Sequence, residues 1–327
     1  MALTPIDEQH ALQIQAGTIG RKAGHAFEDE ITLRINSLEK PYTATTGIGD
    51  NSHVIKGRPE LLLLDYVCTR LGLTTITNVV ALSTGALATS EDGKKWLEVN
   101  GVKVSKCKSD LILTITTTTG DLITAGISTK QCSNKNPTNA QLFFTTARSF
   151  CLLLRSNGIA VSNDAENALR QFCGDAGFRP LDTPELIAGR QTDPRRFFWE
   201  EIADDGKQEW EAIFADGQDA ITRLLLQKAY LNDPFAPDFV LHKTRLAESW
   251  ETTELALYSI DELVELSRNY AGFVLKPYSV KKGSYRDPVG VSHEAPRFGI
   301  VQMQRGGQSQ HPTQLQFNLK AGYFYEI

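Results

Sequence analysis

The sequence lacks a long hydrophobic run, because no stretch of about 18 consecutive apolar residues occurs in the chain. A helix that spans a membrane is therefore not expected. The first residues, Met1 to Glu8, include two acids and no apolar centre, which is unlike a secretory signal. Together these absences predict a cytoplasmic protein with no membrane partner.

Cysteine is scarce, and its five occurrences are odd in number and widely spaced. None of them forms a Cys-x-x-Cys pair or a cluster with histidine, and the six histidines do not recur at metal-ligand spacing. Free thiols in a reducing compartment are expected, rather than disulfides or structural zinc. The sequence also has no nucleophile elbow, and Gly47-Ile48-Gly49-Asp50 is a lone glycine pair rather than a phosphate-binding loop.

An overall excess of basic residues is missing too, since the net charge is −5 at pH 7. This argues mildly against a nucleic-acid ligand, but the charge is unevenly distributed. Residues 271–320 hold seven Lys and Arg against two acids, and residues 101–135 hold five against two. A locally basic surface on an acidic protein can bind phosphates. The alternative is a solvated surface on which these charges cluster by chance.

The distribution of apolar and turn-forming residues predicts a mixed α and β fold. Helices are expected over residues 19–38, 59–71, 139–155, 165–173 and 220–231, with a short one from residue 261. Strands are expected in a hairpin over 110–131, over 239–245 and 255–259, and in a second hairpin that joins 298–304 to 314–319. Residues 73–105 are expected to be irregular or to form short strands, and residues 174–209 to be the loosest segment.

The first predicted hairpin carries the candidate catalytic residues. Asp110 opens its first strand, and Ser128 and Lys130 lie at the end of its second. Side chains alternate along a strand, so Ser128 and Lys130 face the same side. A loop of odd length centred on Thr119 or Gly120 would bring Asp110 to that side, and a loop of even length would not.

A carboxylate that binds a cation, with a second oxygen ligand and a lysine beside it, is a minimal apparatus for metal-assisted cleavage of a phosphodiester. The alternative makes Asp110 a strand-start residue, Ser128 a satisfied hydroxyl and Lys130 a solvated charge. The basic segment around the hairpin and the acid Glu28 on an upstream helix favour the nuclease interpretation.

In order and spacing, these residues and several flanking blocks resemble the PD-(D/E)xK nuclease superfamily, and within it the Type II restriction endonucleases of the MspI type. The resemblance implies a restriction-endonuclease-like core, an α/β fold with a central mixed sheet flanked by helices, and a C-terminal β-hairpin for DNA recognition. It also implies a catalytic core over residues 1–175 and a recognition half over 176–327, packed as one continuous globule. The blocks that carry the resemblance are Gly20–Lys22, Phe27–Ile31, Ser109-Asp110, Ser128–Lys130, Pro237–Phe239, Ile260–Val264 and Phe298–Phe317.

By the same resemblance, Asp110 is the main metal ligand and Lys130 orients or polarises the attacking water. Ser128 takes the middle position, where the superfamily usually has Asp or Glu, and Glu28 would supply the missing negative charge. The expected cofactor is Mg²⁺, because this ion prefers oxygen ligands together with phosphate and water. For Glu28, the alternative is an exposed acid on a helix.

The implied function is that of a Type II restriction endonuclease, which hydrolyses double-stranded DNA at a short site and leaves 5′-phosphate and 3′-hydroxyl ends. A GC-rich site is among the candidates, and a cognate DNA methyltransferase is expected in the same system without a stable complex. Arg, Asn and Gln can read base edges, and Lys can bind phosphates. The alternatives are a modification-dependent or nicking nuclease, or a DNA-binding protein on the same fold that does not cleave. The predicted DNA-binding residues are Lys135, Thr138, Lys281, Lys282, Arg286, Gln302, Gln304, Arg305, Gln308, Gln316 and Asn318.

Overall fold

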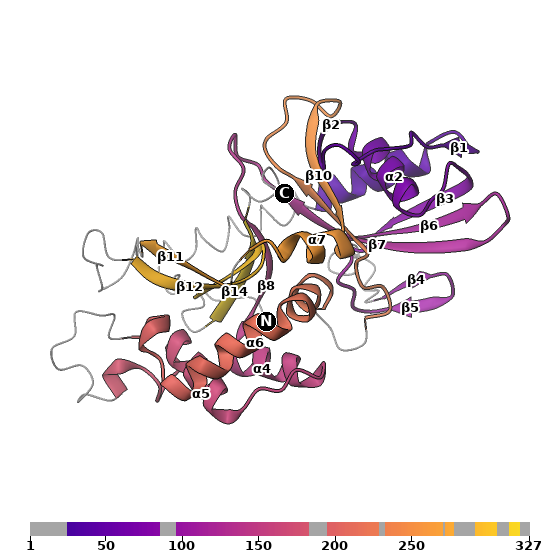
Figure 1. Cartoon of the computed structure of the whole chain (residues 1–327). Helices are drawn as coiled ribbons and strands as arrows, with labels where there is room; N and C mark the ends of the chain where they lie inside the picture. The colour runs from indigo at the N-terminus through magenta and orange to yellow at the C-terminus, as the bar shows by residue number, and fades with distance from the viewer. Residues whose placement is uncertain are drawn as a thin grey trace, which may run out of the picture. The chain divides into compact units, whose positions relative to one another are not determined.

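The computed structural model describes residues 25–85, 96–182, 195–228, 233–270, 272–277, 292–305 and 314–320 (Figure 1). These residues form two compact units. The first is made from described residues within Met1–Ala140 and Leu226–Leu263, and the second from those within Gln141–Leu225 and Val264–Lys320. Each unit is therefore discontinuous in sequence, whereas the sequence pattern suggests a single boundary after residue 175. The assignment of catalysis and recognition to two halves of the chain stays a prediction.

A seven-stranded sheet with the strand order β1-β3-β6-β7-β9-β10-β2 forms the centre of the first unit. All neighbouring strands are antiparallel except β7 and β9, which are parallel, so the expected mixed sheet is confirmed. Its strands are β1 (Tyr42–Thr43), β2 (Val54–Gly57), β3 (Thr75–Ser83), β6 (Leu111–Thr117), β7 (Leu122–Gln131), β9 (Phe239–Lys243) and β10 (Thr253–Ser259).

Two helices flank one face of this sheet, one over residues 25–36 and the other α2 (Pro59–Arg70). The predicted apolar stripe on the first helix is confirmed, because Phe27, Ile31 and Ile35 are buried in the same core as the sheet. Burial of this kind, rather than intrinsic helix propensity, supplies most of the stability of such helices. The part of the predicted helix before residue 25 lies outside the described residues.

The opposite face of the sheet carries a small hairpin formed by β4 (Leu97–Val99) and β5 (Val102–Val104). Figure 1 shows this hairpin and α2 on opposite sides of β6 and β7. Alternation along β6 explains the division, because Leu111 and Leu113 enter the main core while Ile112 packs under the hairpin.

The second unit contains a five-stranded sheet with the order β11-β12-β13-β14-β8. The predicted C-terminal hairpin is confirmed, since β13 and β14 pair antiparallel with Val301 opposite Leu319. Phe150, Phe298 and Phe317 pack their rings together in this unit. The strands are β8 (Ala140–Thr146), β11 (Phe273–Pro277), β12 (Ser292–Phe298), β13 (Val301–Arg305) and β14 (Gln314–Leu319), and the helices are α4 (Ala147–Ser156), α5 (Asn163–Cys173), α6 (Asp204–Gln227) and α7 (Ile260–Ser267), the last beginning in the first unit.

Three segments differ from the sequence-based expectation. Residues 73–105 contain β3, a nine-residue strand inside the sheet rather than irregular structure. Residues 139–155 begin as a strand, because α4 starts only after Thr146, whose side chain accepts a hydrogen bond from the Ser149 backbone at 3.2 Å. Such a cap starts a helix in mid-segment. The helix expected over 220–231 begins already at Asp204, within the segment expected to be loose.

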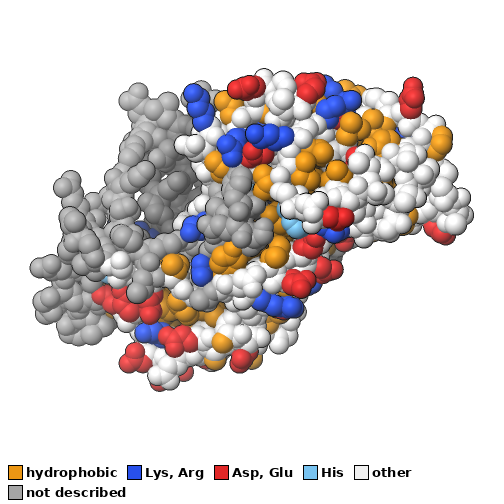
Figure 2. Space-filling view, turned by 45° about the horizontal axis from the view of Figure 1, so that its top comes forward, with side chains coloured by type: hydrophobic (Ala, Val, Ile, Leu, Met, Phe, Trp, Pro, Cys, Tyr) orange, Lys and Arg blue, Asp and Glu red, His pale blue; other side chains and the backbone are white. Residues whose placement is uncertain are grey.

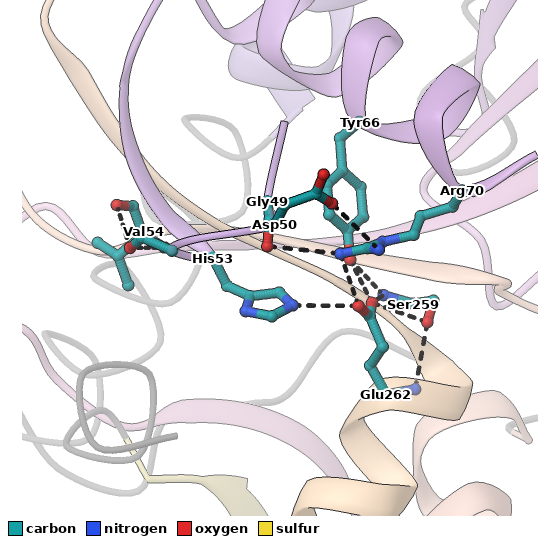
Figure 3. Close-up of polar contacts among 9 residues, drawn as sticks. Gly49, Asp50, His53, Val54, Tyr66, Arg70, Ser259 and Glu262 are labelled. Atoms are coloured by element: carbon teal, nitrogen blue, oxygen red, sulfur yellow. Dashed lines mark hydrogen bonds and ion pairs between the residues drawn. The ribbon is translucent and has the colours of Figure 1, made fainter. Parts of the chain in front are cut away.

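A network of polar contacts around Glu262 joins several elements of the first unit (Figure 3). Glu262, in the first turn of α7, accepts hydrogen bonds from Tyr66 Oη, from His53 Nε2 at 3.1 Å and from the Ser259 backbone at 2.8 Å. It also forms an ion pair of 2.7 Å with Arg70. Side chains from α2, from the segment before β2 and from the end of β10 thus converge on one carboxylate.

All five cysteines are free thiols, as expected. None of the helices in the described part of the chain is both long and apolar enough to cross a membrane.

Candidate active site

The β6–β7 hairpin determines where the predicted catalytic residues lie. Leu111 pairs with Ile127, so the loop is centred on Thr119 and has an odd number of residues. An odd loop is what directs Asp110 to the same side of the hairpin as Ser128 and Lys130. The Asp110 backbone continues the ladder by donating to the Ile127 carbonyl at 2.8 Å. Asp110 therefore lies beside Ser128, as expected for an odd loop.

The side chains of this cluster are linked by hydrogen bonds. Asp110 Oδ2 accepts from the Thr129 backbone N–H at 2.7 Å and from Ser128 Oγ at 3.3 Å. Lys130 Nζ donates to Ser128 Oγ at 3.0 Å and to the Thr129 carbonyl at 2.6 Å, and it lies 3.6 Å from Asp110 Oδ2. The Ser128 hydroxyl thus bridges the carboxylate and the ammonium group. Ser128 is 2% exposed, whereas the side chains of Lys130 and Asp110 are 17% and 33% exposed, so the carboxylate is open to solvent.

Glu28 reaches the same cluster from the helix over residues 25–36. Its Oε1 accepts a hydrogen bond from Thr129 Oγ1 at 2.5 Å. Burial raises the pKa of Glu28 to about 7, helped by the negative charge of Asp110, while the Thr129 hydrogen bond and the charge of Lys130 oppose the shift. Glu28 is therefore a buried acid beside a second carboxylate, and the alternative of an exposed helix residue is wrong.

Two basic residues that the sequence pattern did not single out also influence the cluster. His242 on β9 is the parallel partner of Lys130, and burial together with the Lys130 charge lowers its pKa to about 4, so it is neutral at pH 7. Burial and the same lysine lower the pKa of Lys108 to about 8, with Asp110 opposing. Lys108 could have been found from its place two residues before Asp110. His242 lies beside Lys130 because β9 pairs in parallel with β7, and the sequence of neither strand alone predicts this pairing.

The oxygen atoms available for a metal ion come mainly from Asp110 and Glu28, with the Ser128 hydroxyl as a neutral donor. Within the described ranges, no group of three or more His, Cys, Asp or Glu side chains is arranged to hold a metal ion. Two carboxylates and a hydroxyl fit a hard cation such as Mg²⁺, which keeps several waters and takes further oxygens from phosphate. They do not fit a tightly enclosed structural metal.

The predicted DNA-binding residues fall into distinct environments. Lys135 and Thr138 are exposed on the segment between β7 and β8. Gln304 and Gln316 are half-buried on β13 and β14. The side chains of Lys281, Lys282, Arg286, Arg305 and Gln308 lie outside the described residues.

Asn318 of the C-terminal hairpin is buried and bonded to its neighbours. Asn318, 3% exposed, donates to Gln304 Oε1 at 3.2 Å and accepts from Gln316 Nε2 at 3.2 Å. Gln302 is directly opposite Asn318 and is also buried. Gln304, Asn318 and Gln316 thus form one hydrogen-bonded row across β13 and β14, and the row extends to Gln141 on β8, which accepts from Gln316 at 3.2 Å.

On the face of the molecule shown in Figure 2, the Lys and Arg side chains of described residues lie among Asp and Glu side chains. On this face, a polyanion would meet small groups of basic residues rather than a broad surface of one sign.

No family model matches the sequence, and neither does any curated protein. A solved structure of the restriction endonuclease MspI in complex with its cognate DNA is similar over 77% of this chain and 75% of that one, with 14% identical residues and a TM-score of 0.41. Likeness at this level does not identify a family, so the functional argument rests on the site itself.

Proposed function

We propose that this protein is a Mg²⁺-dependent, sequence-specific DNA endonuclease of the Type II restriction class. The observation that carries the proposal is the cluster in which Asp110, Ser128 and Lys130 share hydrogen bonds at the end of one hairpin, with Glu28 buried beside it. Oxygen donors for a cation and a lysine for the attacking water or the phosphate are what phosphodiester hydrolysis needs.

In this proposal Asp110 and Glu28 hold the Mg²⁺, which when bound stabilises the negative charge that develops on the phosphate oxygens. Lys130 is fixed by Ser128 and by the Thr129 carbonyl, and in this proposal its ammonium group polarises the attacking water or the phosphate. The water oxygen forms a bond to phosphorus while the bond to the 3′ oxygen breaks. The water proton passes to solvent and the 3′ oxygen takes one up, which leaves a 5′-phosphate and a 3′-hydroxyl.

Recognition is assigned to the C-terminal hairpin and to the segment after β7. Gln304 and Gln316 are the half-buried amides, so they are the first candidates for base contacts, while Asn318 holds both through hydrogen bonds. The proposed phosphate contacts, which orient the DNA, are Lys135, Thr138, Lys281, Lys282 and Arg286. A cognate methyltransferase belongs to this proposal, because the host's own DNA must be protected.

A second candidate is a DNA-binding protein that does not cleave. Ser128 motivates it, because a neutral hydroxyl stands where the superfamily pattern has an acid. The lack of a three-ligand metal group among the described residues points the same way.

The test is incubation of the purified protein with unmethylated phage DNA and Mg²⁺, with gel electrophoresis and sequencing of the ends. The restriction proposal expects discrete fragments that disappear on chelation and in Lys130→Ala. Cleavage restricted to modified DNA would indicate the modification-dependent alternative, and single-strand breaks a nicking enzyme. Salt-sensitive binding without cleavage would favour the second candidate. If the protein neither bound nor cleaved DNA, that result would contradict both candidates.

Ser128 offers a matched pair of variants. In Ser128→Ala, Lys130 loses one of its two fixed hydrogen-bond partners, so the cleavage rate at saturating Mg²⁺ is expected to fall roughly tenfold. Ser128→Asp adds a charged oxygen ligand, so it is expected to lower the Mg²⁺ concentration at half-maximal rate. Rates measured across a Mg²⁺ titration check both. Identical titrations for all three proteins would show that position 128 does not act on the metal or on Lys130.

A further inference from the structure

The β4–β5 hairpin is attached to the seven-stranded sheet at its tip and along its strands. Its turn residues, Asn100 and Gly101, have φ of 50° and 79°, which is the arrangement of a type I′ turn. The Asn100 side chain donates to Thr114 Oγ1 at 3.1 Å and to Thr124 Oγ1 at 2.9 Å. The tip of the hairpin is thus tied to β6 and β7.

The strands of the hairpin are anchored as well. Val99 and Val104 are buried against Ile112 of β6, in a small apolar cluster separate from the main core. An isolated two-stranded hairpin is only marginally stable in water, and these contacts supply what it lacks.

This hairpin packs on the face of the sheet to which Ser128 and Lys130 point. Thr124 lies four residues before Ser128 and six before Lys130 on β7, so alternation directs all three side chains to the same face. The chain leaves β5 and reaches Asp110 within six residues. The hairpin is therefore close in sequence to Asp110, and its tip is bonded to the strand that carries Ser128 and Lys130.

That outer surface is basic and carries an exposed aromatic ring. Lys103 is exposed, with Nζ 4.8 Å from the centroid of the Trp96 ring, which is itself 38% exposed. Lys106 follows on the exposed segment between β5 and Asp110, and Glu98 opposite Lys103 is the acid that offsets them. A lysine ammonium that lies over an indole ring is attracted to it, which restricts the position of the charge.

We propose that the β4–β5 hairpin is a DNA-contacting element, in which Lys103 and Lys106 bind backbone phosphates of the DNA. The inference rests on the proposed function and extends it to a surface that the C-terminal hairpin does not include. Double-stranded DNA is the occupant that fits, because its phosphates are regularly spaced charges complementary to two lysines on a rigid support.

The test compares binding of a DNA duplex by the intact protein, by the double variant Lys103→Gln/Lys106→Gln and by Lys56→Gln, at several salt concentrations with Ca²⁺ in place of Mg²⁺. Lys56 is the matched control, since it is an exposed lysine on edge strand β2 of the same unit, paired with Glu254. Each lost phosphate contact lowers the salt slope by about 0.9, so the double variant is expected to lose about 2 in slope and roughly tenfold or more in affinity.

A second variant distinguishes the effect of the hairpin's position from the effect of the lysine charges. Asn100→Gly keeps a residue suited to the type I′ turn but removes the hydrogen bonds to Thr114 and Thr124, so it is expected to weaken binding without changing the net charge. If the intact protein binds DNA but the lysine double variant has the salt slope of Lys56→Gln, the hairpin inference is overturned and the proposed function stands. If the intact protein neither binds nor cleaves DNA, both fall.

Discussion

Asp110→Asn is expected to reduce DNA cleavage at least about a thousandfold while DNA binding is kept. Asparagine has nearly the same size and retains a carbonyl oxygen that can accept from the Thr129 backbone, so the hairpin register is preserved. What is lost is the negative charge that the proposal assigns to metal binding. A thousandfold loss corresponds to about 4 kcal/mol of transition-state stabilisation, which is within the range of metal-dependent electrostatic catalysis.

The measurement is the single-turnover cleavage rate at saturating protein, together with the affinity for uncleaved DNA. Asp121→Asn is the matched control, because Asp121 lies in the loop of the same hairpin, where it accepts a hydrogen bond from Thr119 at 2.6 Å. The control is expected to cleave at the normal rate. Cleavage by Asp110→Asn within about tenfold of the unmodified protein would remove Asp110 from the mechanism. Loss of cleavage and of DNA binding together would instead indicate a change in the fold.

The approach of Asp110 to Ser128 and Lys130 could be predicted from sequence because these three residues lie on one hairpin. The register of a hairpin is fixed by its own loop, so a turn centred on Thr119 is enough to bring Asp110 beside Ser128. The same local logic explains why the C-terminal hairpin and the helix that begins at Pro59 were predicted correctly. Helices and hairpins whose turns and ends are determined by their own residues can be predicted from the sequence.

Other parts of the site depend on contacts between segments far apart in the chain. His242 is next to Lys130 only because β9 pairs in parallel with β7, and parallel pairs carry no turn that sets their register. The burial of Glu28 results from the packing of its helix on the sheet. The strand at Ala140–Thr146 was mistaken for helix because its residues complete a sheet formed mainly by much later strands. Tertiary pairing decided each of these cases.

The polar network in Figure 3 leads to the second large expected effect, which concerns stability rather than cleavage. Burial alone would raise the pKa of Glu262, but hydrogen bonds from His53, Tyr66 and Ser259 overcome it and lower the pKa to about 2. Glu262 is 24% exposed, so solvent screens the network only partly. The charged carboxylate therefore stabilises the folded state.

Glu262→Gln is expected to lower the free energy of unfolding at pH 7 by about 2 to 3 kcal/mol, because an amide cannot accept from all of these donors and leaves Arg70 without its ion-pair partner. The folded pKa lies below the ordinary value of 4.5, so the stabilisation is present above about pH 4.5 and is lost as the pH falls toward about 2. The difference between the two proteins should shrink over that range.

Urea unfolding of both proteins at pH 7, 5, 4 and 3 measures this difference directly, provided that both unfold in a single transition. Glu265→Gln is the matched control, since it removes an exposed acid from the same helix one turn later. The control is expected to change stability by less than about 0.5 kcal/mol at every pH. A Glu262→Gln penalty that stays constant from pH 7 to pH 3 would mean that lost packing, and not the carboxylate charge, accounts for the effect.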